Sequence, residues 1–389
     1  MVHLGLGAFF RAHQAWYTDR APDAAEWGIA AFTGRSAALA ETLRAQDCAY
    51  TLVTQGPSGP TFEQIASLSD VRAASDQDAW LDYLSRPEVA VVTITVTEAG
   101  YHGGVGGAPA RLLAGLQARR SAGAGAISLV PCDNLPDNGP VLRAAVLSLA
   151  AEPGLSAWIE DHVDFVTTMV DRITPATTEV DRLLVLERTG FDDRAPVVTE
   201  PFSDWVLSGD FPAGRPAWDA TFVSDVEPYE RRKLWLLNGA HSLLAYAGIL
   251  RGHETVQQAV ADATLRGWVE QWWDEAATRL PQDRGDTDDY RAALLTRFAN
   301  PGIRHLLAQI AMDGSQKIPA RILPSLRAER AAGRMPTGST RVLAAWARYQ
   351  ARSDPIEVAV DRALGAVAPD LRADVDLVQA VVTLATAVG

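Results

Sequence analysis

Hydrophobic and polar positions follow two different patterns along the chain, and the pattern changes near residue 200. Before that point, short apolar runs rich in β-branched residues alternate with stretches of helical periodicity. The run VAVVTITVTEAG (89–100) is apolar almost throughout, which is typical of a parallel strand covered on both faces. The alternation predicts an α/β fold with a parallel, doubly wound sheet, with strands at 2–7, 28–36, 89–100 and 126–134 and helices at 11–21, 36–46 and 109–120.

From about residue 229 onward, strand signals give way to helical periodicity alone. This pattern predicts an all-α second half, with helices within 230–250, 254–280, 289–299, 339–352 and 376–388. The connection 203–230 contains proline, glycine and tryptophan and is too long for a turn, so we expect part of it to pack back on the sheet. A chain of 389 residues exceeds what one core supports, and we expect domains at 1–228 and 229–389.

Composition and charge exclude several classes of protein. The net charge of −13 argues against a nucleic-acid or anionic-membrane partner. Two cysteines, Cys48 and Cys132, cannot build a disulfide framework, and their spacing matches no zinc motif, so no metal is expected. The chain start lacks the features of a secretory signal, and no uncharged apolar stretch reaches about 18 residues. These observations predict a cytoplasmic protein.

A glycine pair follows the first predicted strand. Gly5 and Gly7 stand between that strand and the next helix, where a Rossmann-like domain binds the pyrophosphate of a dinucleotide. Glycines let phosphates approach the backbone, and the helix N-terminus adds partial positive charge. Phe10 stands where the full motif has a third small residue, and glycines are also common in turns that bind nothing. Because the pair lies in an α/β half, we expect NAD or NADP here, with Arg11 near the phosphates.

Further loops at the carboxyl ends of strands are candidate ligand sites, because open α/β sheets bind ligands there. Arg35 follows the second strand, where NAD enzymes place an acid, and this favours a 2′-phosphate unless the arginine faces water. Thr97 and Glu98, and then Asp133 and Asn134, are expected to flank a nicotinamide. The alternatives are a helix N-terminal acid for Glu98 and a turn pair for the other loop.

The run RRKLWLLNGAHSLLAY (231–246) places polar residues in what is otherwise a buried helix. At about 100° per residue, Glu230, His241 and Asn238 lie about 60°, 80° and 140° from Lys233. Oxidation of a secondary alcohol requires a proton acceptor, and a lysine with a lowered pKa can serve. Asparagine amides can stabilise the alkoxide, a histidine can orient a hydroxyl, and Glu230 can pass the proton to solvent. The alternative is a snorkelling lysine beside a core histidine.

The helix motif K-x4-N-x2-H, after a Rossmann-like half that opens with GxGxFxRxH, resembles the mannitol dehydrogenase family of polyol-specific long-chain dehydrogenases. The resemblance spans nearly the whole chain, although the first strand begins unusually close to the chain start. The matching segments are GLGAFFRAH (5–13), TVTEAGY (95–101), CDNL (132–135), DRITP (171–175), EPF (200–202), 233–241 and DGSQKIP (313–319).

This resemblance implies a zinc-independent, NAD(P)-dependent oxidoreductase acting on a polyol or sugar acid. Lys233 matches the general base, and His241 matches a position that orients the substrate. Two asparagines match the pair that stabilises the oxyanion, Asn134 and Asn238. The residues expected beside the cofactor or in the substrate pocket are Phe9, Asp171, Lys317 and Arg321.

The resemblance leaves the substrate open. The leading hypothesis is a hexitol and its 2-ketose, such as D-mannitol and D-fructose. Fructuronate reductase (D-mannonate) and mannitol-1-phosphate 5-dehydrogenase are rivals, because Lys317, Arg321 or Arg327 can supply a cation for an anionic substrate. A hypothesis of another class is a non-catalytic dinucleotide-binding redox sensor. Beyond a small-molecule substrate, a monomer or weak homo-oligomer is expected.

Overall fold

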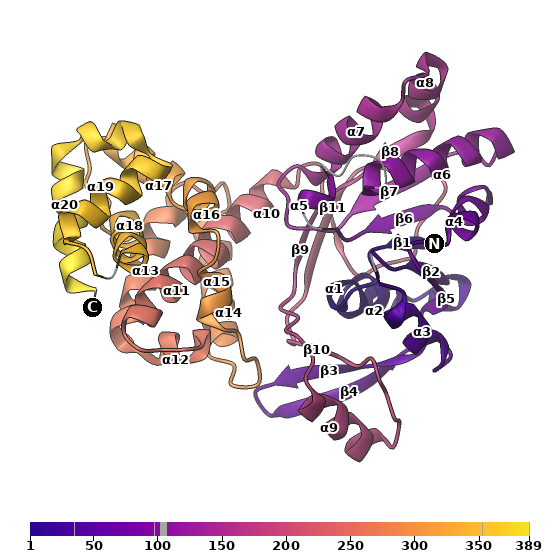
Figure 1. Cartoon of the computed structure of the whole chain (residues 1–389), viewed down its shortest axis with the longest axis horizontal. Helices are drawn as coiled ribbons and strands as arrows, with labels where there is room; N and C mark the ends of the chain where they lie inside the picture. The colour runs from indigo at the N-terminus through magenta and orange to yellow at the C-terminus, as the bar shows by residue number, and fades with distance from the viewer. Residues whose placement is uncertain (35, 97, 102–106, 352, 389) are drawn as a thin grey trace. The chain divides into compact units, whose positions relative to one another are not determined.

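The computed structural model describes residues 1–34, 36–96, 98–101, 107–351 and 353–388. The chain forms two compact units, Met1–Glu227 and Pro228–Gly389. The first is an α/β unit and the second is built from helices (Figure 1).

The α/β unit is organised around a six-stranded parallel sheet with the order β5-β2-β1-β6-β7-β8. Its strands are β1 (Val2–Leu4), β2 (Ile29–Phe32), β5 (Leu68–Arg72), β6 (Val91–Ile94), β7 (Ile127–Pro131) and β8 (Val163–Phe165). This order is that of a doubly wound sheet, and the direction of winding reverses between β1 and β6. The predicted parallel Rossmann-like sheet is confirmed. Each of the four predicted strands is shorter in the structure than the run of residues that predicted it.

Helices cover both faces of this sheet (Figure 1). Neighbouring residues such as Val91 and Val92 point to opposite faces, and each belongs to a different buried cluster. This explains why the strands are apolar without alternation. The predicted helix 11–21 is interrupted at His13, whose backbone is not helical (φ −125°, ψ −91°). The helices of this unit are α1 (Ala8–Ala12), α2 (Gln14–Asp19), η1 (Ala24–Glu26), α3 (Ala38–Arg44), α4 (Gln77–Leu84), α5 (Glu98–Tyr101), α6 (Ala108–Ala122), α7 (Asn138–Leu149), α8 (Pro153–His162) and α9 (Glu179–Thr189).

Two small sheets complete the unit, and neither was predicted. One has the order β10-β3-β4 and the other β12-β11-β9. Part of the connection 203–230 forms β11, which pairs antiparallel with β9 in a separate sheet. Trp205 and Trp218 of this connection pack into the core on one face of the main sheet, which confirms the expectation that part of it packs back there. The strands are β3 (Tyr50–Gly56), β4 (Gly59–Ile65), β9 (Thr167–Asp171), β10 (Val197–Thr199), β11 (Asp204–Ser208) and β12 (Thr221–Phe222).

The second unit is all-helical, as predicted, with one isolated bridge between Thr255 and Leu306 in its described residues. Helix α11 lies at its centre and packs against α12, α13, α15 and α18, which explains its nearly uniform burial. The helices, beginning with one that spans the unit boundary, are α10 (Glu227–Arg232), η2 (Lys233–Gly239), α11 (Ala240–Leu250), α12 (Val256–Ala261), α13 (Ala263–Ala277), α14 (Arg284–Phe298), α15 (Leu307–Ile310), α16 (Gly314–Arg321), α17 (Leu323–Ala331), α18 (Thr337–Gln350), α19 (Ile356–Val367), η3 (Pro369–Ala373) and α20 (Val375–Ala387).

The helix predicted over 230–250 is not α-helical throughout. Residues Lys233–Gly239 form a π-helical segment, η2, between the α-helical stretches α10 and α11. Hydrophobic periodicity does not reveal this difference, because most residues of the run 233–246 are apolar and the pattern shows no break where the spacing changes.

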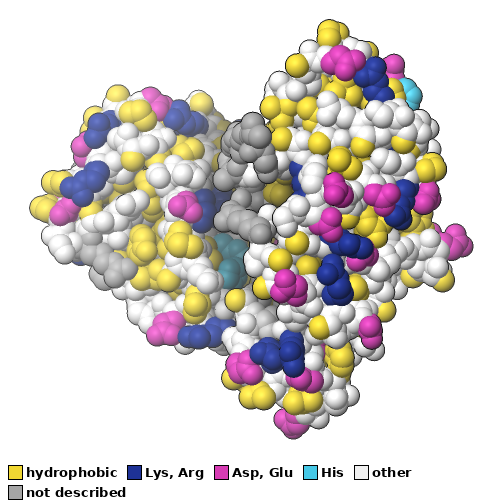
Figure 2. Space-filling view, turned by 45° about the vertical axis from the view of Figure 1, so that its right-hand side comes forward, with side chains coloured by type: hydrophobic (Ala, Val, Ile, Leu, Met, Phe, Trp, Pro, Cys, Tyr) yellow, Lys and Arg dark blue, Asp and Glu magenta, His cyan; other side chains and the backbone are white. Residues whose placement is uncertain are grey.

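Within the described residues, none of the helices has the length and apolar character that a membrane crossing requires. On the face drawn in Figure 2, acidic and basic side chains are interspersed. The net charge of −13 therefore does not gather in one field on that face.

Candidate active site

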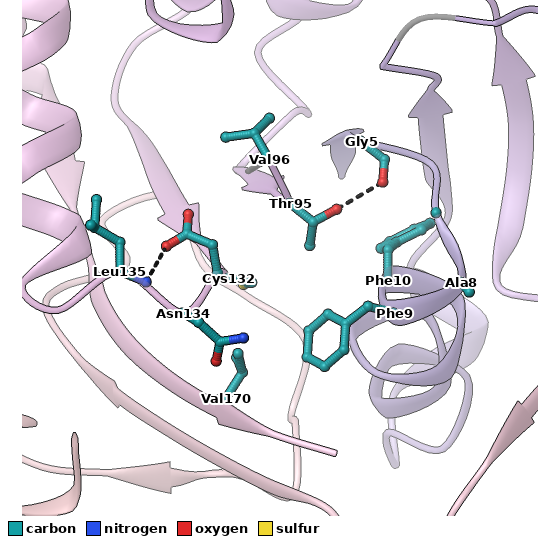
Figure 3. A pocket seen from close by; sticks show the side chains of 12 residues that line it. Gly5, Ala8, Phe9, Phe10, Thr95, Val96, Cys132, Asn134, Leu135 and Val170 are labelled. Atoms are coloured by element: carbon teal, nitrogen blue, oxygen red, sulfur yellow. Dashed lines mark hydrogen bonds between the residues drawn. The ribbon is translucent and has the colours of Figure 1, made fainter. Parts of the chain in front are cut away.

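A cavity of about 440 Å³ lies at the carboxyl ends of β1, β6 and β7, where the winding of the sheet reverses. This is the position at which doubly wound sheets bind ligands. Figure 3 shows Phe9 and Asn134 projecting toward the same space from different elements. The residues that line the cavity are Gly5, Gly7, Ala8, Phe9, Phe10, Thr95, Val96, Cys132, Asp133, Asn134, Leu135 and Val170.

Gly5 is required by the close approach of two strand ends. Its φ is +114°, and a Cβ atom there would lie 2.0 Å from the carbonyl oxygen of Thr95. The Thr95 hydroxyl donates to the Gly5 carbonyl at 2.7 Å, which joins the loops after β1 and β6 (Figure 3). Gly7 has no such steric need and is the N-cap residue that precedes α1. The first glycine of the motif therefore shapes the cavity wall, and the second borders it.

The loop after β7 contributes a polar wall to the same cavity. The Tyr101 hydroxyl donates to Asp133 Oδ2, and the Leu135 amide donates to Asp133 Oδ1 at 3.1 Å. Burial, followed by the Asp133 charge, raises the pKa of Tyr101, so this hydroxyl keeps its proton. Asn134 is exposed at the cavity. The two residues expected to form a turn pair thus have different roles, because Asp133 holds the loop and Asn134 faces the cavity.

Arg11 is neither at the surface nor exposed to the cavity. Its side chain is 6% exposed, its Nε donates to the Gly7 carbonyl at 3.3 Å, and its Nη1 donates to the Ala195 carbonyl. The guanidinium also lies over the Tyr50 ring. Arg11 therefore links the glycine turn to the segment that contains Ala195. Its contact with phosphates stays a prediction.

Three other residues were predicted to lie beside the cofactor. Arg35 and Thr97 lie outside the described residues. Glu98 begins helix α5. Their roles stay predictions.

Asp171 ends β9 and is buried, opposite Asp204 of β11. The next residue, Arg172, donates to the Glu200 carbonyl through Nε and Nη2 at 3.3 Å. The Ile173 amide donates to Glu200 Oε1 at 2.7 Å. These hydrogen bonds join two segments that matched the family separately, 171–175 and 200–202, and fix the end of β9.

In the helical unit, Lys233 is the first residue of the π-helical segment and is 9% exposed. Glu230 and Asn238 are half-buried on the same continuous helix, and His241 is 5% exposed. The Asn238 carbonyl accepts bonds from Ser242 Oγ at 3.1 Å and from Arg321 Nη1 at 3.3 Å. The structure therefore ties Asn238 to Arg321, two residues that the sequence placed in the site separately.

His241 lies against a second histidine that the sequence analysis missed. The ring centroids of His241 and His305 are 4.9 Å apart at an interplanar angle of 83°. Burial, followed by nearby positive charge, lowers the pKa of both rings, that of His305 to about 4. Both imidazoles are therefore neutral at pH 7. No partner exists within the described residues for three buried polar atoms, His241 Nε2, His305 Nδ1 and Tyr246 Oη.

The predicted cations Lys317 and Arg321 both lie on α16. Lys317 Nζ donates to the carbonyls of Ile310 at 3.2 Å and Met312 at 2.6 Å. Arg321 Nη1 also donates to Ser242 Oγ at 3.1 Å. Burial lowers the pKa of both groups. The Nε and Nη2 donors of Arg321 have no partner in the part of the chain that the structure describes.

No group of three or more histidine, cysteine, aspartate or glutamate side chains among the described residues is arranged to hold a metal ion.

The chain belongs to the mannitol dehydrogenase family. Residues 1–220 match the mannitol dehydrogenase Rossmann domain, and residues 225–387 match the mannitol dehydrogenase C-terminal domain. The predicted resemblance is thereby confirmed over nearly the whole chain.

Individual relatives are similar along most of their length. The D-mannonate oxidoreductase of Escherichia coli is 36% identical over 93% of this chain and 82% of that protein. The mannitol 2-dehydrogenase of Cereibacter sphaeroides is 36% identical over 90% of this chain and 80% of that protein. The structure of Pseudomonas fluorescens mannitol 2-dehydrogenase, a ternary complex with NAD and D-mannitol, matches with a TM-score of 0.85 at 32% identity, over 99% of this chain and 91% of that chain.

Sequence reasoning missed His305, Ser242 and Tyr246. The last two stand in the run 231–246 and follow His241 by one and five residues, so a full helical projection could have included them. His305 stands in a stretch without periodicity and has no sequence signal that associates it with His241.

Proposed function

We propose that this protein is an NAD(P)-dependent oxidoreductase that interconverts a hexitol and its 2-ketose, with Lys233 as the general base. The observation that carries the proposal is the burial of Lys233, at 9% exposure, on the helix that also bears Asn238 and His241. Burial removes water from around the ammonium, and this desolvation favours the neutral amine that a base requires.

The use of basic residues along the chain supports the same role. Of 35 lysines and arginines, two are lysines, Lys233 and Lys317. Arginine cannot release its proton in a protein, whereas lysine can. A chain that otherwise uses arginine almost throughout thus has a lysine at the position that the resemblance assigns to the base.

The cavity at β1, β6 and β7 fits part of a dinucleotide. It combines a glycine turn with apolar walls from Phe9 and Val96 and a polar rim from Asn134. A nicotinamide cofactor, when bound, accepts a hydride from the alcohol carbon or returns it to the ketone carbon. The relative of known structure was solved with NAD and D-mannitol, which supports a dinucleotide for this chain.

The residues of this chain would handle the proton and the oxygen. Neutral Lys233 takes the hydroxyl proton during oxidation, and its ammonium returns it during reduction. The amide donors of Asn238 stabilise charge on the oxygen, and Asn134 is proposed as their counterpart. His241 is neutral, its Nε2 has no partner among the residues that the structure describes, and it can bond a substrate hydroxyl. Glu230, one turn before Lys233, is proposed to pass the proton to solvent.

A second candidate is the oxidation of D-mannonate. Two donors of Arg321 have no partner in the described part of the chain, and a guanidinium edge binds a carboxylate in a bidentate manner. One relative at 36% identity is a D-mannonate oxidoreductase. The same guanidinium can also bond the hydroxyls of a neutral hexitol, so the substrate has to be assigned by assay.

The test is a reduction assay that follows NADH and NADPH consumption with D-fructose, D-fructuronate and fructose 6-phosphate side by side. We expect D-fructose to be reduced without added metal and after dialysis against a chelator. A strong preference for either anion would transfer the assignment to that substrate. Turnover of none of the three, together with tight binding of NADH, would favour the redox sensor. Activity that a chelator abolishes and zinc restores would contradict the proposed mechanism.

A further inference from the structure

The π-helical segment changes which side chains share a face of the catalytic helix. Its seven residues, Lys233–Gly239, advance by about 82° each, since a π turn takes roughly 4.4 residues. Asn238 then lies about 50° from Lys233, compared with about 140° in an α-helix. His241 lies about 30° away on the other side. The wide turn therefore gathers all three side chains within about 80° of arc.

Two adjacent tryptophans of α13 bond the backbone of this segment. Trp272 Nε1 donates to the Trp235 carbonyl at 2.9 Å. Trp273 Nε1 donates to the Leu236 carbonyl at 2.8 Å. Both indoles are fully buried, and both bonds are made away from water. Consecutive carbonyls of the segment are thus directed toward α13, in addition to any bond along the helix.

The packing around the indoles is specific to this arrangement. A Cβ atom at Gly239 would lie 2.6 Å from Trp272 Nε1, so only glycine lets the indole approach the last residue of the segment. The Trp273 ring lies 6.3 Å from that of Phe298, which in turn lies 4.8 Å from the ring of His241. The tryptophan pair therefore packs against the last residue of the segment and, through Phe298, against His241.

We propose that Trp272 and Trp273 are positioning residues, whose indole N–H groups hold the π turn that presents Lys233, Asn238 and His241 together. The inference rests on the proposed function for the roles of these three side chains. Neither tryptophan touches the reacting atoms in this account. They act through the backbone of η2. Their loss should therefore change kcat and the midpoint of the kcat–pH profile, and leave cofactor binding unchanged.

The experiment compares Trp272→Phe and Trp273→Phe with Trp80→Phe. Trp80 is a matched control, because it is also fully buried and its Nε1 donates at 2.9 Å to a helix carbonyl, that of Arg111 on α6. We expect the two α13 variants to lose roughly 10- to 100-fold in kcat, with cofactor KM unchanged and a shifted midpoint of the kcat–pH profile. The control should lower Tm to a similar extent and keep kcat and the midpoint. Equal losses of Tm with normal kcat and midpoint in all three variants would overturn the proposal.

A second measurement remains informative if the chain turns over no sugar or a tryptophan variant folds poorly. Because the chain has two lysines, reductive ¹³C-methylation gives two side-chain NMR signals, and Lys317→Arg assigns them. We expect Trp272→Phe, Trp273→Phe and Gly239→Ala to shift the titration of the Lys233 signal and leave the Lys317 signal in place. An unchanged Lys233 titration in all folded variants would refute the positioning role, whether or not the proposed function holds.

Discussion

Two buried arginines, one in each unit, show how differently this chain uses polar groups. Arg119 of α6 is fully buried, and its five N–H donors meet five main-chain carbonyls, those of Leu84, Arg86, Ala124, Gly125 and Ala126. Arg321 of α16 bonds the Asn238 carbonyl and Ser242 Oγ through Nη1, and its Nε and Nη2 have no partner among the described residues.

The difference distinguishes polar groups that stabilise the fold from polar groups that are available to a ligand. Saturated donors, as in Arg119, stabilise the chain and leave nothing for a ligand. Near Arg321, His241 Nε2 and Tyr246 Oη also have no partner among the described residues, and burial without partners is unfavourable unless a ligand supplies them. The comparison predicts that variants in the first environment lose stability, whereas variants in the second lose turnover.

The largest expected effect is on the proposed base. Lys233→Arg keeps a positive charge but cannot exchange its proton near neutral pH. We expect kcat to fall by about 100- to 10,000-fold while NADH still binds, as followed by cofactor fluorescence. A variant that retains wild-type kcat would show that Lys233 acts by charge alone and would remove the basis of the proposed mechanism.

The next effect is on stability alone. Lys has three donors, so Arg119→Lys leaves at least two of the five carbonyls without a bond from this side chain. We expect the free energy of unfolding, measured by chemical denaturation, to fall by about 3 kcal/mol, with kcat per folded molecule unchanged. A stable variant with impaired kcat would reverse the assignment of Arg119.

Arg321→Lys is the matched substitution in the helical unit. The substitution removes the planar guanidinium edge formed by Nε and Nη2. We therefore expect kcat/KM for the sugar to fall by about 10- to 100-fold. The stability loss should be smaller than that of Arg119→Lys, at about 1 kcal/mol. If the two variants lose stability equally and neither loses activity, the comparison fails.

The smallest expected effect concerns pH. Burial lowers the pKa of His305 from 6.5 to about 4, so between these values the unfolded chain binds a proton that the folded chain does not. Stability is therefore complete above about pH 6.5 and declines as the pH falls toward 4, with a contribution of about 2 kcal/mol between pH 7 and 5. His305→Gln should weaken this decline, as measured by denaturation at both pH values. An identical decline in the variant would show that other groups cause it.

The sequence predicted the elements whose signals are local. Apolar runs marked four of the six parallel strands but not β5 and β8, and spaced motifs marked Gly5 and Asn134, which line the cavity, and the buried Lys233. The features it missed depend on contacts between distant segments. Arg119 stands next to Arg120 at a helix end and resembles a solvated basic pair, yet it is fully buried. The π turn is held by Trp272 and Trp273, more than thirty residues further along the chain. Periodicity within one helix carries no record of such partners.

The central claim is that Lys233 exchanges the substrate proton, and the pH dependence of kcat in both directions tests it most directly. Oxidation requires the neutral amine, so its kcat should rise with pH through the pKa of Lys233 and then level off. Reduction requires the ammonium, so its kcat should fall over the same range. A flat profile in the oxidation direction, with a full isotope effect from substrate deuterated at the reacting carbon, would contradict the account.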